Sequence, residues 1–111
     1  MAGTIKRLAG PLALTTTYTT NIFNDASALL YSVVRHIHVA NKLATDTFRL
    51  YLGLTGANTA GTELFYNYSI AANTAYDYYP ILKMTSADFL VGGAATTLTL
   101  VITIEGEQYV V

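Results

Sequence analysis

Apolar and polar residues alternate with a period of two along much of this chain, and this pattern limits the possible folds more than any other feature. In segment 98–104, Leu98, Leu100, Ile102 and Ile104 fall on one side and threonines fall on the other. Successive side chains of a β-strand point to opposite faces, so a period of two is typical of strands. Residues that favour helices are never sustained over ten positions. The pattern therefore predicts an all-β protein.

Two more segments alternate strongly. In segment 48–54 the apolar side holds Phe48, Leu50, Leu52 and Leu54, and the other side holds Arg49 and Tyr51. Segment 31–41 differs, because neither of its sides is polar throughout. Alternation places Tyr31, Val33, Arg35, Ile37 and Val39 opposite Ser32, Val34, His36, His38 and Ala40. We expect such a strand to be covered on both faces, or to have its outer face in an interface.

Shorter segments rich in Thr, Tyr and Val predict further strands, with turn residues between them. These segments are 5–8, 12–18, 21–23, 63–68, 75–79 and 89–91, whereas 26–30 is long enough for one helical turn at most. Short strands at this spacing indicate a sandwich or barrel. We predict one antiparallel, jelly-roll-like β-sandwich over residues 12–111, preceded by an extended N-terminal arm over residues 1–11.

The composition excludes several classes of protein. Only 12% of the 111 residues are charged, 52% are hydrophobic, and the net charge is −1. Nucleic-acid binding needs clustered Lys and Arg, and disorder needs low hydrophobicity, so neither is expected. No cysteine is present, which excludes disulfide scaffolds and thiol catalysis. The uncharged runs 9–24 and 89–104 are shorter than a membrane-spanning helix, and we expect no membrane segment.

The two histidines, His36 and His38, lie two positions apart on one predicted strand. This spacing can seat a metal ion, but a site needs a third ligand, and the nearest downstream acids are Asp46 and Glu63. We therefore predict no metal site, no cofactor and no catalytic residues. A metal-dependent jelly-roll enzyme is the least favoured alternative. We expect hydrogen bonds of the imidazoles across the sheet or at a subunit contact, where they can respond to pH.

Nine tyrosines and few charges favour a protein that buries surface against partners, because tyrosine is enriched in interface cores. Alternation predicts that Tyr66 and Tyr68 share one strand face and that Tyr76 and Tyr78 share another. The candidate interface residues are Lys6, Arg7, Arg35, His36, His38, Tyr66, Tyr68, Tyr76, Tyr78 and Tyr79. Arg35 lies among apolar residues and is expected to need a charged partner. A carbohydrate-binding module that uses the surface at 76–79 is an alternative of another class.

Three segments resemble small β-sandwich virion proteins of tailed bacteriophages. They are VRHIHVAN at 34–41, TFRLYLG at 47–53 and YSIAANTAYD at 68–77, within a resemblance that covers residues 28–104. Their motifs are strand patterns rather than chemical signatures. The resemblance implies a non-enzymatic protein, either a head decoration (cement) subunit that binds the capsid surface or a tail or baseplate subunit.

A decoration role implies contacts with the major capsid protein or other virion proteins. It also implies a homo-oligomer, with a trimer favoured because cyclic symmetry suits a repeated lattice. The arm would then lie on a neighbouring subunit. A chain without cysteine can fold in the reducing bacterial cytoplasm, so assembly there and localisation in the virion are expected.

Overall fold

The computed structural model describes residues 3–25, 29–53, 58 and 60–110, with only the backbone at residues 29 and 30. These residues form nine strands, and they include no helix that is long and apolar enough to cross a membrane. The strands are β1 (Thr4–Ala13), β2 (Asn21–Phe23), β3 (Leu29–Asn41), β4 (Asp46–Gly53), β5 (Glu63–Ile70), β6 (Thr74–Tyr78), β7 (Leu82–Met84), β8 (Phe89–Ala94) and β9 (Leu100–Val110).

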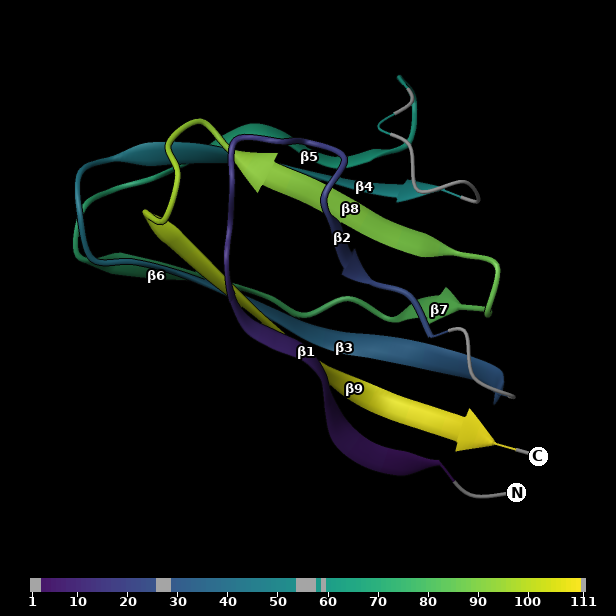
Figure 1. Cartoon of the computed structure of the whole chain (residues 1–111). Coiled ribbons are helices and arrows are strands. Elements are labelled where there is room, and N and C mark those ends of the chain that lie inside the picture. The colour runs from purple at the N-terminus through teal and green to yellow at the C-terminus, as the bar shows by residue number, and fades with distance from the viewer. Residues whose placement is uncertain (1–2, 26–28, 54–57, 59, 111) are drawn as a thin grey trace.

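Two antiparallel sheets face each other as the layers of a sandwich (Figure 1). The larger sheet has the order β1-β9-β3-β6, with β7 also paired to β3, and the smaller sheet has the order β2-β8-β4-β5. Consecutive strands change layer except from β4 to β5 and from β6 to β7, which is the strand order of a double-sheet jelly roll. The predicted all-β, jelly-roll-like sandwich is confirmed.

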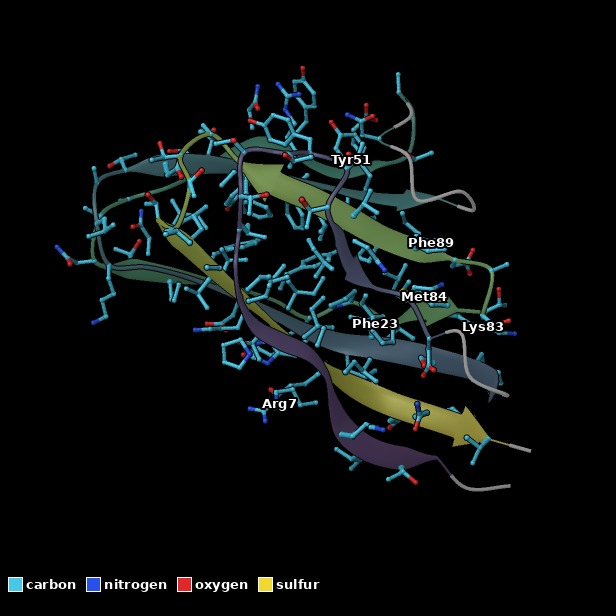
Figure 2. The ribbon with its side chains drawn as sticks, in the orientation of Figure 1. Arg7, Phe23, Tyr51, Lys83, Met84 and Phe89 are labelled. Atoms are coloured by element: carbon cyan, nitrogen blue, oxygen red, sulfur yellow. The ribbon has the colours of Figure 1, made fainter. Side chains whose placement is uncertain are left out.

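Apolar side chains from both sheets fill the space between the layers. Phe23 from β2 and Met84 from β7 lie there in Figure 2. The largest fully buried side chains are Phe48, Leu14, Ile37, Leu50, Met84, Leu90, Leu100, Ile102, Ile104, Val34, Val39 and Val91. The apolar sides expected for 48–54 and 98–104 supply five of them, so alternation identified the centre of the core.

The N-terminal segment is largely part of the sandwich. Thr4–Ala13 forms β1, which pairs with β9 of the same chain, so most of the segment expected as an arm lies in the larger sheet. The strand expected at 12–18 is wrong beyond residue 13. There the chain leaves the larger sheet and crosses to the smaller one, where the Ala94 amide donates a hydrogen bond to the Thr15 carbonyl. The crossing segment covers the edge of β8.

Strand β3 departs from the expected alternation at Arg35. Val34 pairs with Gly106 of β9 and His36 pairs with Glu105, so Arg35 is the extra residue of a β-bulge. Even-numbered residues therefore face the core before the bulge, and odd-numbered residues face it afterwards. The buried residues of β3 are Ser32, Val34, Ile37, Val39 and Asn41. The expected division of this strand into two faces is wrong for that reason.

One smaller expectation is also wrong. Leu98, expected to begin the apolar side of the last strand, is 64% exposed because it lies in a turn with a φ of 64°. Tyr51 stays on the side of β4 opposite Leu50, as expected, but this ring is only 2% exposed. Leu54 lies outside the described residues, as does most of the segment expected as one helical turn.

Candidate functional site

Four titratable side chains gather on the outer face of the larger sheet. His36 and His38 follow the bulge of β3, and both point outward because Ile37 between them is buried. Asp77 of β6 pairs with His38, and Glu105 of β9 pairs with His36. Directly paired residues of an antiparallel sheet have neighbouring side chains on the same face. The register therefore places two carboxylates beside two imidazoles.

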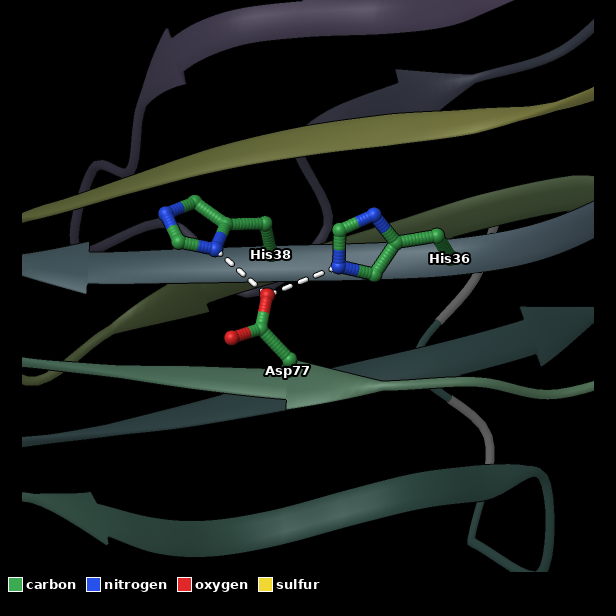
Figure 3. A group of neighbouring side chains, drawn as sticks. All are labelled: His36, His38 and Asp77. Atoms are coloured by element: carbon green, nitrogen blue, oxygen red, sulfur yellow. Dashed lines mark hydrogen bonds and ion pairs between the residues drawn. The ribbon is translucent and has the colours of Figure 1, made fainter.

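Both imidazoles contact the same carboxylate oxygen (Figure 3). His36 Nε2 lies 2.7 Å from Asp77 Oδ1, and His38 Nδ1 lies 2.6 Å from it. The remaining ring nitrogen of His36, Nδ1, lies 3.2 Å from Glu105 Oε1. The structure thus has the cross-sheet hydrogen bonds that were expected for the imidazoles. We call His36, His38 and Asp77 the His–Asp cluster.

Solvent reaches the His–Asp cluster, and its charges perturb one another. The side chains of His36, His38 and Asp77 are 24%, 38% and 39% exposed. Burial lowers the pKa of His36, but hydrogen bonds and charge from Asp77 and Glu105 outweigh it and raise that pKa above its ordinary value. Hydrogen bonds from His38 and His36 lower the pKa of Asp77. The arrangement thus favours positive charge between the carboxylates.

A groove of about 620 Å³ lies beside the cluster, and we call it the outer groove. Its apolar lining includes Ile5, Tyr79 and Ile81, which are 83%, 72% and 81% exposed. Its charged lining residues are Lys6, Arg7, Arg35, Glu105 and Glu107. The ring of Tyr79 stacks on His36, with centroids 4.6 Å apart and planes 6° apart. The outer groove and the His–Asp cluster therefore form one continuous surface.

The three basic candidates, Lys6, Arg7 and Arg35, all line the outer groove, but their contacts differ. Arg35 Nη1 lies 3.6 Å from Glu107 Oε1, which provides the expected charged partner within the chain. Lys6 Nζ donates a hydrogen bond to Gln108 Oε1 at 3.0 Å. Arg7 extends away from the core on the outer side of β1 (Figure 2).

Tyr66 and Tyr68 do not share a face, contrary to the expectation from alternation. Asn67 between them has a φ of 53°, and β5 carries an extra residue opposite β4 at this point. Tyr66 therefore lies on the outer face of the smaller sheet, where it stacks on the guanidinium of Arg49 with 4.2 Å between that group and the ring centroid. Tyr68 turns to the inner side and contacts Phe48.

Tyr76 and Tyr78 share the inner face of β6, as expected, but they pack within the chain. Both rings contact Phe65, with centroids 5.7 Å and 5.0 Å apart, and Tyr68 lies 4.6 Å from Tyr76. This aromatic cluster joins the edge strands β5 and β6 of the two sheets. Burial raises the pKa of Tyr76, and its contact with Tyr68 adds to that effect. Of the segment 76–79, Tyr79 alone is left as an exposed ring.

Sequence reasoning missed Asp77 and Glu105 as partners of the histidines. Asp77 gave one local signal, because it is an acidic residue inside the predicted strand 75–79. The contacts of Asp77 with His36 and His38 span 41 and 39 residues. They depend on the register between two strands, which local sequence patterns do not contain.

No family model, no curated protein and no solved structure matches this chain.

Proposed function

We propose that this chain is a non-enzymatic structural subunit of a tailed-phage virion that binds the capsid surface as a decoration subunit. The jelly roll supports a role of this kind, since viral capsid and lectin domains often use it. The resemblance of segments 34–41, 47–53 and 68–77 supports a phage protein. A tail or baseplate subunit is the alternative within this class.

The exposed apolar lining of the outer groove is the observation that carries the proposal. Ile5, Tyr79 and Ile81 are each more than 70% exposed and line one groove. Large exposed apolar residues gathered at one place and surrounded by charges are typical of protein–protein contacts. The surrounding charges are both positive and negative, which suits a protein surface better than the uniform charge of a nucleic acid.

The experiment is binding to heads of the same phage that were produced without this chain. The purified protein is incubated with these heads, and the bound fraction is measured by sedimentation. We expect saturable binding that falls at least about fivefold in Ile81→Ser and in Tyr79→Ser, which is the effect of removing an interface residue worth about 1 kcal/mol. Light scattering of the free protein is expected to give a trimer.

The matched control is Leu43→Ser. Leu43 is also apolar and 58% exposed, but it lies between β3 and β4, away from the outer groove. Its binding is expected to equal that of the original chain. Binding to isolated tails instead of heads overturns decoration in favour of the tail or baseplate role. A protein that remains monomeric and binds neither particle overturns the structural class.

The placement of Tyr76 and Tyr78 argues against the carbohydrate-binding alternative. Sugar rings stack on exposed aromatic faces, whereas these two rings face the inner aromatic cluster around Phe65. Tyr79 is exposed, but one of its faces is occupied by His36.

A further inference from the structure

The ring nitrogens of His36 face two carboxylates at once. Nδ1 lies 3.2 Å from Glu105 Oε1, and Nε2 lies 2.7 Å from Asp77 Oδ1. A neutral imidazole has one N–H donor and one lone pair. Neutral His36 can therefore satisfy one carboxylate and would direct a lone pair at the other. The lone pair and that carboxylate repel each other. A proton or a metal ion between them removes the repulsion.

The contact of His38 adds to this demand for positive charge. His38 Nδ1 lies 2.6 Å from the same oxygen that His36 contacts, Asp77 Oδ1. Figure 3 shows the two rings converging on this oxygen from neighbouring outward positions of β3. The two nitrogens and a carboxylate oxygen all lie within 4.8 Å of one another. Three potential metal ligands thus surround one small volume.

We propose that His36 Nε2, His38 Nδ1 and a carboxylate oxygen of Asp77 bind one divalent transition-metal ion of the zinc type. Zinc takes nitrogen and oxygen ligands at about 2.0–2.2 Å, usually with four ligands in a tetrahedron. Two ligand atoms of such a tetrahedron lie about 3.3–3.6 Å apart. Asp77 Oδ1 lies 2.7 and 2.6 Å from the two nitrogens, so it has to draw back by about 1 Å for the ion to fit. The fourth position is open to water from the solvent side, since all three side chains are partly exposed.

Glu105 occupies the place of an outer-shell partner. Histidines that bind metals commonly donate their second N–H to a carboxylate, which fixes the tautomer and the ring orientation. Glu105 Oε1 accepts in this way from His36 Nδ1 and leaves Nε2 with a lone pair directed at the metal position. Imidazole and carboxylate ligands together suit zinc better than calcium or magnesium, which prefer oxygen ligands only.

Metal binding at this point would hold β6 to β3. β6 is the edge strand of the larger sheet, and Asp77 is its contribution to the cluster. A ligand that binds only the folded chain stabilises it by mass action. At a free zinc concentration 100 times the dissociation constant, the unfolding equilibrium constant is expected to fall about 100-fold.

The experiment uses tag-free protein and zinc alone. Chelator-treated protein is titrated with Zn²⁺ by calorimetry, and long-range ¹H–¹⁵N spectra follow the imidazole nitrogens. The chain has two histidines and no cysteine, so histidine-bound zinc can be assigned without ambiguity. We expect one saturable site per chain, with shifts at His36 Nε2 and His38 Nδ1. Thermal unfolding with and without zinc measures the stabilisation.

Three variants and one control test the ligand set. Glu105→Gln is expected to weaken zinc binding about 10- to 100-fold, as changes of outer-shell partners do. His38→Ala and the isosteric Asp77→Asn are expected to weaken it more than that. Glu63→Gln, which changes an exposed carboxylate of the other sheet, is expected to bind as the original chain does.

Either of two results overturns the metal site. One is an absence of saturable zinc binding to folded protein, which would leave a proton as the only positive species in the cluster. The other is equal zinc affinity in Asp77→Asn and Glu63→Gln. Neither result bears on capsid binding, which is measured separately.

Discussion

Gly106 of β9 lies directly against the backbone carbonyl of Val33 on β3. A Cβ atom at position 106 would overlap the Val33 carbonyl oxygen, which cannot move aside as the end of a side chain can. Gly106 also pairs with Val34, the last residue before the bulge of β3. The absence of a side chain at Gly106 thus permits the close approach of β9 and β3 beside the bulge, where the inward-facing residues of β3 change from even-numbered to odd-numbered.

Gly106→Ala should therefore destabilise the fold by about 1–3 kcal/mol, the usual cost of forcing extra atoms into a packed site. Urea unfolding followed by tyrosine fluorescence measures it, since the chain has nine tyrosines and no tryptophan. We expect a lower midpoint with an unchanged slope. A loss below about 0.5 kcal/mol, which is typical of neutral surface positions, would contradict the role given to Gly106.

The sandwich itself was predictable because most of its strands have one buried and one outer face. Residues 100, 102 and 104 of β9 alternate without interruption, and all three are buried. Where alternation is regular, burial follows directly from the sequence. Strand β7 escaped prediction because Leu82–Met84 is too short to show a period.

The candidate site was less predictable because two bulges shift the phase of its strands. Val33 points outward before the bulge at Arg35. Because of that extra residue, the even-numbered His36 and His38 point outward as well, on the same face as the odd-numbered Val33. The extra residue near Asn67 separates Tyr66 from Tyr68. A bulge depends on the strand opposite, so local alternation does not reveal it.

The aromatic cluster between the sheets leads to a second prediction. Phe65 contacts four other rings, which belong to Phe48, Tyr68, Tyr76 and Tyr78. Phe65→Ala should cost about 3 kcal/mol, because it removes a large ring that joins both sheets. Thermal unfolding measures the loss. Leu43→Ala, at a 58% exposed position in a turn, should change stability by less than about 0.5 kcal/mol. Equal effects of the two changes would contradict the role of the cluster.

Arg49 carries a third prediction because its guanidinium lies between two rings. Its central carbon is 4.2 Å from the ring centroids of both Tyr18 and Tyr66, and its Nε donates to Asn67 Oδ1 at 2.8 Å. Each cation–π contact at a partly exposed site is worth about 0.5–1 kcal/mol. Arg49→Ala should therefore lose about 1–2 kcal/mol in urea unfolding.

Arg49→Lys serves as the matched control, since it keeps the charge but loses the planar group that stacks on both rings. We expect it to lie between the original chain and Arg49→Ala. If the lysine variant is as stable as the original chain, the stacking of the guanidinium has no energetic role.

Tyr109 leads to a prediction about pH. Its hydroxyl donates to Glu107 Oε2 at 2.8 Å, and this hydrogen bond, with burial and the glutamate charge, raises its pKa. The protonated form thus stabilises the fold below pH about 10, and this contribution is lost as the pH rises through the raised pKa. NMR titration of the ring carbons should show Tyr109 ionising later than an ordinary tyrosine. Glu107→Gln should lower that pKa, and Glu63→Gln should leave it unchanged.

The last prediction concerns Asn41, a polar side chain that is 1% exposed at the end of β3. Its amide donates to the carbonyls of Ala44 and Ile70, and its oxygen accepts from the amide of Leu43. These bonds fasten the β3–β4 turn to the end of β5. Asn41→Ala leaves buried backbone groups without partners, so it should cost about 2–3 kcal/mol in urea unfolding. Asn21→Ala, at an exposed position of β2, should cost less than about 0.5 kcal/mol. A similar loss in both variants would mean that the turn does not depend on the Asn41 side chain.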